Sequence, residues 1–166
     1  MQNKDDLYFM KKAITAAKRA SRVGEVPVGA VIVKGTEIIS GGRNMRELDK
    51  NSLLHAEIVA INRACKKLGR WRLSDCDLYV TLEPCPMCTG AAINTRFRRV
   101  IFGAYDNKAG SLGSVINLNE LGYNHKLEVV GGVMKDECAA LLSDFFKQLR
   151  NRIIKHKEVQ YENPMG

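Results

Sequence analysis

Four side chains of the chain have the types and spacing of a metal site. His55 and Glu57 lie two residues apart, and Cys85 and Cys88 form a C-x-x-C pair directly after a proline. Residues three apart face the same side of a helix, so both thiols can bind one ion. Residues two apart diverge in a regular helix, so Glu57 is not expected to bind the ion beside His55. The pattern predicts a zinc site whose ligands are His55, Cys85 and Cys88.

The number of ligands predicts what such a site would do. Catalytic zinc sites have three protein ligands and leave the fourth position to water, whereas structural sites are closed by four. Zinc lowers the pKa of bound water from about 16 to about 7, and a nearby carboxylate can move its protons. Glu57 is the expected proton carrier. Helices are expected to begin at both ligand groups, because the N-terminal dipole favours the thiolate that binds metal.

The elements that must position these residues follow from the apolar pattern. The expected helices cover Lys4–Arg22, His55–Leu68, Cys85–Asn94 and Met134 to about Lys155, and the expected strands cover Val28–Lys34, Glu37–Gly42, Asp77–Leu82, Arg98–Gly103 and Leu127–Val133. Two metal-bearing helices, each followed by a strand, predict βαβ crossovers packed on one sheet. The fold class is therefore α/β, with the site at the carboxyl ends of strands.

Length and composition limit the possible classes of protein. The chain has 166 residues, of which 45% are hydrophobic, which predicts a single domain over residues 1–157 and a flexible tail over 158–166. Its polar start and the absence of a long apolar run predict a cytoplasmic protein that does not enter a membrane. Five cysteines, two of them in the C-x-x-C pair, argue against a disulfide framework.

The remaining thiols have their own expected places. Cys65 and Cys138 continue apolar helical spacings and are expected in the core, and Cys76 is expected at a loop or strand edge.

The charge suggests a polyanionic partner. Lys and Arg number 26 against 18 acidic residues, a net charge of +8. Basic residues crowd around an aromatic pair near the C-terminus, with Arg150 and Arg152 following Phe145 and Phe146. Single-stranded RNA is held by stacking on aromatics and by basic side chains along its backbone. These four residues are candidate RNA contacts, and the alternative is a solvated end of a helix.

The spacing H-x-E followed by P-C-x-x-C resembles the signature of the zinc-dependent cytidine and nucleobase deaminases. More narrowly, the chain resembles the bacterial tRNA-specific adenosine deaminases from its first helix to about Arg152. The matching segments are Glu25-Val26-Pro27-Val28-Gly29-Ala30, Asn44, His55-Ala56-Glu57, Leu82-Glu83-Pro84-Cys85-Pro86-Met87-Cys88, Phe102-Gly103-Ala104, Asp106, and Asp136-Glu137-Cys138-Ala139-Ala140-Leu141-Leu142. The chain departs from the family in the loop before His55, where it reads Asn51-Ser52-Leu53-Leu54.

The resemblance implies a fold, a cofactor and an activity. The fold would be a three-layer α/β/α, cytidine-deaminase-like arrangement with a mixed sheet of about five strands and helices on both faces. The protein would be a homodimer with one Zn²⁺ per chain. Its reaction would convert adenosine to inosine at the wobble position of a tRNA anticodon stem-loop, with a zinc-activated hydroxide attacking C6 and Glu57 moving the protons.

The resemblance also implies which residues bind the substrate. Asn44 would hold the base, because its amide can donate and accept on a purine edge. The backbone at Ala56 would hold it as well, Val28 and Ala104 would lie beside it, and Asp106 would contact ribose or backbone.

Two other functions remain open from the sequence. The same zinc motif deaminates free nucleobases or nucleosides, of the guanine or cytosine type. A zinc-stabilised RNA-binding protein without catalysis would need a fourth protein ligand, and His125 is expected to be structural or exposed instead.

Overall fold

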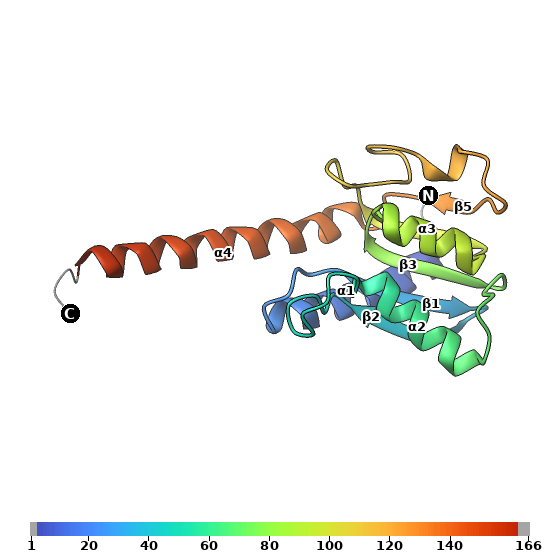
Figure 1. The fold of residues 1–166 in the computed structure, drawn as a ribbon, viewed down its shortest axis with the longest axis horizontal. Helices are drawn as coiled ribbons and strands as arrows, with labels where there is room; N and C mark the ends of the chain where they lie inside the picture. Colours follow the sequence, from blue (N-terminus) through green and yellow to red (C-terminus); the bar gives the residue numbers. More distant parts are fainter. Residues whose placement is uncertain (1–2, 163–166) are drawn as a thin grey trace.

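Apart from two consecutive strands after the first helix, strands and helices alternate along the chain in the computed structural model, which describes residues 3–162 (Figure 1). The helices are α1 (Lys4–Arg22), α2 (Ala56–Leu68), α3 (Pro86–Thr95), the 3-10 turn η1 (Leu118–Glu120) and α4 (Lys135–Glu162). The strands are β1 (Gly29–Lys34), β2 (Glu37–Arg43), β3 (Cys76–Leu82), β4 (Arg99–Ala104) and β5 (Glu128–Val130). Among the described residues, no helix is both long and apolar enough to cross a membrane.

The strands form one mixed sheet in the order β2-β1-β3-β4-β5. β1 pairs antiparallel with β2 and with β3, whereas β3, β4 and β5 are parallel. β2 and β3 therefore run in the same direction with β1 between them, and α2 crosses over β1. α3 makes the shorter crossover between the adjacent strands β3 and β4. The predicted crossovers on one sheet are confirmed.

Alternating side chains of the central strands separate two apolar cores. Ala30 and Ile32 of β1 belong to the core that contains α2 and α3, and Val31 and Val33 belong to the core that contains α1 and the start of α4. Successive side chains of a strand point to opposite faces of the sheet, so a strand that is buried on both faces contributes alternate residues to two cores. The three-layer α/β/α prediction is confirmed. Cys76 is fully buried in the first core rather than at an edge, because it begins the central strand β3.

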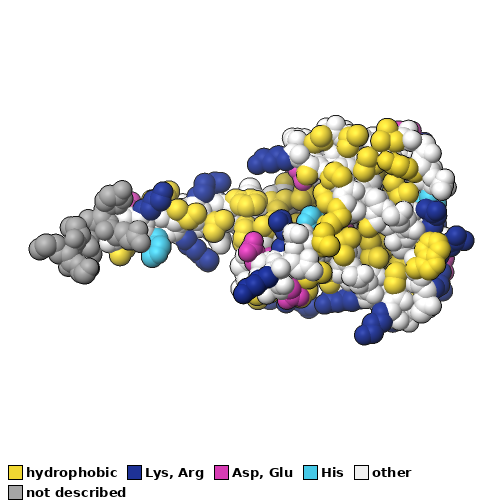
Figure 2. Space-filling model, viewed as in Figure 1, with side chains coloured by type: hydrophobic (Ala, Val, Ile, Leu, Met, Phe, Trp, Pro, Cys, Tyr) yellow, Lys and Arg dark blue, Asp and Glu magenta, His cyan; other side chains and the backbone are white. Residues whose placement is uncertain are grey.

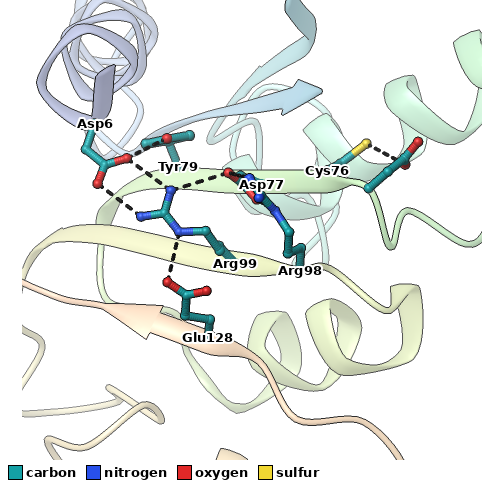
Figure 3. Close-up of polar contacts among 8 residues, drawn as sticks. Asp6, Cys76, Asp77, Tyr79, Arg98, Arg99 and Glu128 are labelled. Atoms are coloured by element: carbon teal, nitrogen blue, oxygen red, sulfur yellow. Dashed lines mark hydrogen bonds and ion pairs between the residues drawn. The ribbon is translucent and has the colours of Figure 1, made fainter. Parts of the chain in front are cut away.

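The N-terminal helix is tied to the sheet by a buried ion-pair network (Figure 3). The Arg99 guanidinium donates to Asp6 at 3.0 Å and to Asp77 at 3.4 Å, and the Tyr79 hydroxyl donates to Asp6 at 2.7 Å. Arg99 exposes only 15% of its side chain, and the two aspartates 6% and 7%. Each charge in this network is therefore compensated by its neighbours.

Replacing Arg99 by Leu should destabilise the fold strongly. The change leaves two buried carboxylates without their shared cation, which costs about 3 kcal/mol of unfolding free energy. Arg98 provides the matched control. It also pairs with Asp77, but 56% of its side chain is exposed, so Arg98→Leu should cost less than about 1 kcal/mol. Urea unfolding of both variants measures the difference, and equal losses would contradict this account of the network.

Helix α4 differs from the expectation in length and burial. It continues past the expected end near Lys155 to Glu162, and residues 163–166 of the predicted tail lie outside the described residues. The helical spacing of the sequence also predicts an apolar stripe that is mostly buried, formed by Ala140, Leu141, Phe145, Leu149 and Ile153. This prediction is wrong beyond the first turns of the helix, since Leu149 and Ile153 are 42% and 50% exposed. The reason is that the helix extends beyond the body, and in Figure 2 basic and apolar side chains alternate along this projecting part.

Candidate active site

The predicted metal ligands lie at the N-terminal ends of two helices. His55 is the N-cap of α2, and Cys85 is the N-cap of α3, which begins with Pro86 at its first position. Neither side chain caps its own helix by a hydrogen bond, so both are free to face a ligand. A Cβ at Gly42 would lie 2.2 Å from the Ala56 carbonyl oxygen, so only glycine lets α2 approach β2 this closely. The expectation that helices begin at both ligand groups is confirmed.

The three predicted ligand atoms converge on one point. Nδ1 of His55 lies 3.6 Å from Sγ of Cys85 and 3.6 Å from Sγ of Cys88. All three ligand atoms lie within 4.8 Å of one another. A tetrahedral zinc ion with Zn–S of about 2.3 Å and Zn–N of about 2.0–2.1 Å would separate sulfur and nitrogen by about 3.6 Å. The three side chains could therefore hold such an ion, and their spacing fits it.

Contacts within the cluster shift the pKa of each of the three predicted ligands. Hydrogen bonds from Cys88 and His55 lower the pKa of Cys85 to about 4, against the effect of its burial. The hydrogen bond to Cys85 raises the pKa of His55. Donation to Cys85 and burial raise the pKa of Cys88. Of the three, Cys85 forms the thiolate most readily, which is the form of cysteine that binds a metal ion.

Glu57 lies beside the ligands without being one of them. It occupies the first turn of α2, and its side chain is buried, with 4% exposed. Its Oε2 has no hydrogen-bond partner in the described part of the chain. Burial, with a smaller contribution from the nearby Cys85, raises the pKa of Glu57 to about 6. A carboxyl group with this pKa can take up and release a proton near neutral pH, as a general base or acid must.

A cavity of about 170 Å³ opens above the cluster, which is much more space than one water molecule needs. It lies where β1, β2, β3 and β4 end or begin, at the carboxyl ends of β3 and β4 as predicted. Its lining residues are Val26, Val28, Asn44, Arg46, His55, Ala56, Glu57, Leu82, Glu83, Cys85, Asp106 and Ala109. Asn44 is 6% exposed, and its amide oxygen has no partner among the described residues. This unpaired amide is suited to bind a polar ring.

Most of the predicted substrate residues meet in this cavity. Val28, Asn44, Ala56 and Asp106 line it. Ala104 does not, because it is 3% exposed in the core on the α1 side of the sheet. The carboxylate of Asp106 accepts from the backbone N–H groups of residues 108 and 109, so it also shapes its own loop.

The candidate RNA contacts lie elsewhere. Phe145, Phe146, Arg150 and Arg152 are all on α4, and none lines the cavity. Phe145 and Arg152 line a separate hollow beside the end of α1, together with Ser21 and Gly24. Phe146 is exposed and makes an edge contact with Phe145. Whether these side chains touch RNA stays a prediction.

Sequence reasoning missed two charged residues of the cavity wall. Arg46 is exposed at the mouth, and Glu83 is buried in the turn that leads to Cys85. Their positions in the sequence could have indicated them, because Arg46 lies two residues after Asn44 and Glu83 lies two residues before Cys85. His125 is structural as expected, since its Nε2 lies 2.6 Å from the Phe97 carbonyl oxygen.

Comparison with known proteins places this geometry among deaminases. The family model of MafB19-like deaminases matches residues 4–150. The tRNA-specific adenosine deaminase of Bacillus subtilis is 52% identical over 149 residues, which cover 89% of this chain and 92% of that protein.

Two solved structures extend the comparison. One comes from work on A-to-I editing by tRNA:A34 deaminases at the wobble position; it is 39% identical, with a TM-score of 0.78, and covers 81% of this chain and 99% of the other. The guanine deaminase of Bacillus subtilis is 42% identical, with a TM-score of 0.59, and covers 63% of this chain and 66% of the other.

Proposed function

Because this chain belongs to the tRNA-specific adenosine deaminase family, we propose that it converts adenosine to inosine by hydrolysis at the wobble position of a tRNA anticodon. The observation that carries the proposal is the convergence of His55, Cys85 and Cys88 beside a buried Glu57, at the floor of a cavity that Asn44 lines. Three protein ligands leave one coordination position for chemistry.

Zn²⁺ fits the donor set of one imidazole and two thiols, and when bound it would make hydroxide available from water at neutral pH. The side chains of the chain have separate tasks. Glu57 takes a proton from the attacking water and delivers it to N1 of adenine; it then takes the proton of the new C6 hydroxyl group and delivers it to the amine that departs as ammonia. Asn44 uses its free amide oxygen to orient the base. Val26, Val28 and Leu82 give the cavity an apolar wall against which the ring can pack.

RNA is the proposed form of the substrate for reasons that lie outside the metal site. An anticodon loop presents an unpaired adenosine, so little energy is needed to extrude it. The net charge of +8 and the basic side chains of α4 support a polyanionic partner. The second candidate is a free nucleobase, which the likeness to a guanine deaminase supports.

The test is deamination by the purified zinc protein of an anticodon stem-loop RNA with adenosine at the wobble position. Free adenosine, adenine, guanine, cytosine and cytidine are assayed beside it. We expect inosine in the RNA and no turnover of the free compounds. Turnover of a free base without reaction of the RNA would refute the RNA proposal and support the second candidate.

The family resemblance also supports a cytoplasmic homodimer. Helix α3 offers a surface for it, since a Cβ at Gly90 would meet no atom within 4 Å and its neighbour Ala91 is only half-buried. Small residues on such a face allow a second copy to approach closely.

A further inference from the structure

Two glutamates near the cavity are buried, although the proposed reaction needs neither of them. Glu25 and Glu83 are each 1% exposed. Among the described residues, neither forms an ion pair with a lysine or arginine. Burying a carboxylate without a cation is unfavourable unless hydrogen bonds compensate it. Both side chains accept hydrogen bonds from the backbone of a loop at the mouth of the cavity, although Oε2 of Glu25 has no partner among the described residues.

Glu83 organises the loop over residues 105–114. Its Oε1 accepts from the backbone N–H of Leu112 at 3.1 Å and of Ser114 at 3.0 Å. Its Oε2 accepts from the backbone N–H of Asp106 at 3.1 Å and from the Ser114 hydroxyl. A Cβ at Gly110 would lie 2.4 Å from this Oε2, so the loop wraps closely around the carboxylate. The same loop supplies Asp106 and Ala109 to the cavity wall.

Glu25 makes the corresponding contact on the opposite wall. Its Oε1 accepts from the backbone N–H of Leu48 at 2.7 Å. Leu48 belongs to the loop over residues 45–54, whose base is closed by the bond from Met45 N–H to the Leu54 carbonyl. Within the described part of the chain, Glu25 is the one side chain outside this loop that hydrogen-bonds its backbone. The loop supplies Arg46 to the cavity and leads directly to His55.

We propose that Glu25 and Glu83 are positioning residues, each of which fixes one loop of the substrate cavity. Glu25 sets the place of Arg46, and Glu83 sets the place of Asp106. Neither touches the reacting atoms, so their effect is on how the nucleotide is held. This inference rests on the proposed function, because it assigns the two loops to the binding of the same RNA substrate.

The test compares Glu83→Gln and Glu25→Leu with wild type on the anticodon stem-loop RNA. At position 83, glutamine keeps the shape of the side chain but replaces one acceptor oxygen by an amide NH2 group that faces N–H donors. At position 25, leucine removes the oxygen that accepts from Leu48, whereas glutamine could keep that bond because the second carboxylate oxygen has no partner among the described residues. We expect KM to rise by about tenfold or more, since a hydrogen bond to a charged group is lost. The value of kcat per bound zinc should fall by less than KM rises. Glu83→Gln should have the larger effect, because it loses more bonds.

Matched exposed residues serve as controls. Glu47→Gln changes the first loop itself, and Glu120→Gln lies just beyond the second; both are exposed and should leave KM and kcat unchanged. If a buried variant fails to fold, Ser114→Ala removes one donor to Glu83 without burying an unpaired group, and it should raise KM in the same direction by a smaller factor. A loss of folded protein or of zinc with unchanged KM would overturn the proposal.

Hydrogen exchange tests the loops without reference to activity. In Glu83→Gln the amides of Asp106, Leu112 and Ser114 should exchange faster, and in Glu25→Leu the amide of Leu48 should do so. Unchanged exchange would overturn the positioning role whatever the kinetics. Wild-type protein that forms no inosine would refute the proposed function, while faster exchange confined to these loops would still support their fixation by the two glutamates.

Discussion

The variant Glu57→Gln should retain its zinc and lose deamination by a factor of about 10³, within the range that proton transfer contributes. Glutamine fills the same space in the first turn of α2 but cannot carry a proton between the attacking water and the base. The metal should stay, because Glu57 lies beside the cluster and is not one of the three converging ligands. Inosine formation under single-turnover conditions and metal analysis of the same sample measure both effects.

Other outcomes of this experiment would change the role assigned to Glu57. Loss of zinc together with activity would mean that Glu57 is a ligand, contrary to the geometry. Activity within about tenfold of wild type would remove Glu57 from proton transfer. RNA binding should be unchanged in this variant, which distinguishes a catalytic defect from a binding defect. Glu47→Gln, an exposed change in the neighbouring loop, serves as the control and should behave as wild type.

The second large effect is expected when a ligand is removed. Wild-type protein should contain about one zinc ion per chain. Cys88→Ala leaves His55 and Cys85 as the only protein ligands, so bound zinc and inosine formation should both fall to background. Treatment of the wild type with a chelator should have the same effect, and added Zn²⁺ should restore activity in the wild type but not in the variant.

A buried cysteine outside the cluster provides the control for this experiment. Cys138→Ala removes a thiol that is 1% exposed in the core on the other side of the sheet. It should keep its zinc and its activity. Full activity in Cys88→Ala, or activity in chelated protein that contains no metal, would contradict the assigned ligands.

The sequence was sufficient to predict the order of the elements and which three side chains come together as candidate metal ligands. His55, Cys85 and Cys88 are recognisable because few residue types bind zinc, and the C-x-x-C spacing brings two of them to one face of a helix. The strands could be recognised from apolar runs that are buried on both faces, as in Val28–Lys34. Each observed strand and α-helix begins within a few residues of its predicted position, although β5 ends earlier and α4 ends later than predicted.

Contacts between loops that lie far apart in the sequence could not be predicted from it. Nothing in the segment around Glu25 predicts that its carboxylate accepts from Leu48, because that bond depends on how β2 and α1 pack together. The burial of α4 was overestimated for a related reason. Periodicity indicates an apolar face, but only the position of the body decides whether anything covers it.

The predicted metal ligands come together only in the folded chain, so binding of a metal ion there would be linked to folding. His55 and Cys85 lie 30 positions apart and belong to different crossovers, so their side chains meet only when α2 and α3 are both docked on the sheet. An ion that binds this arrangement and not the unfolded chain shifts the folding equilibrium by RT ln(1 + [L]/Kd). Starvation for zinc would then reduce the amount of folded enzyme as well as its turnover, and nascent chains would depend on metal to persist.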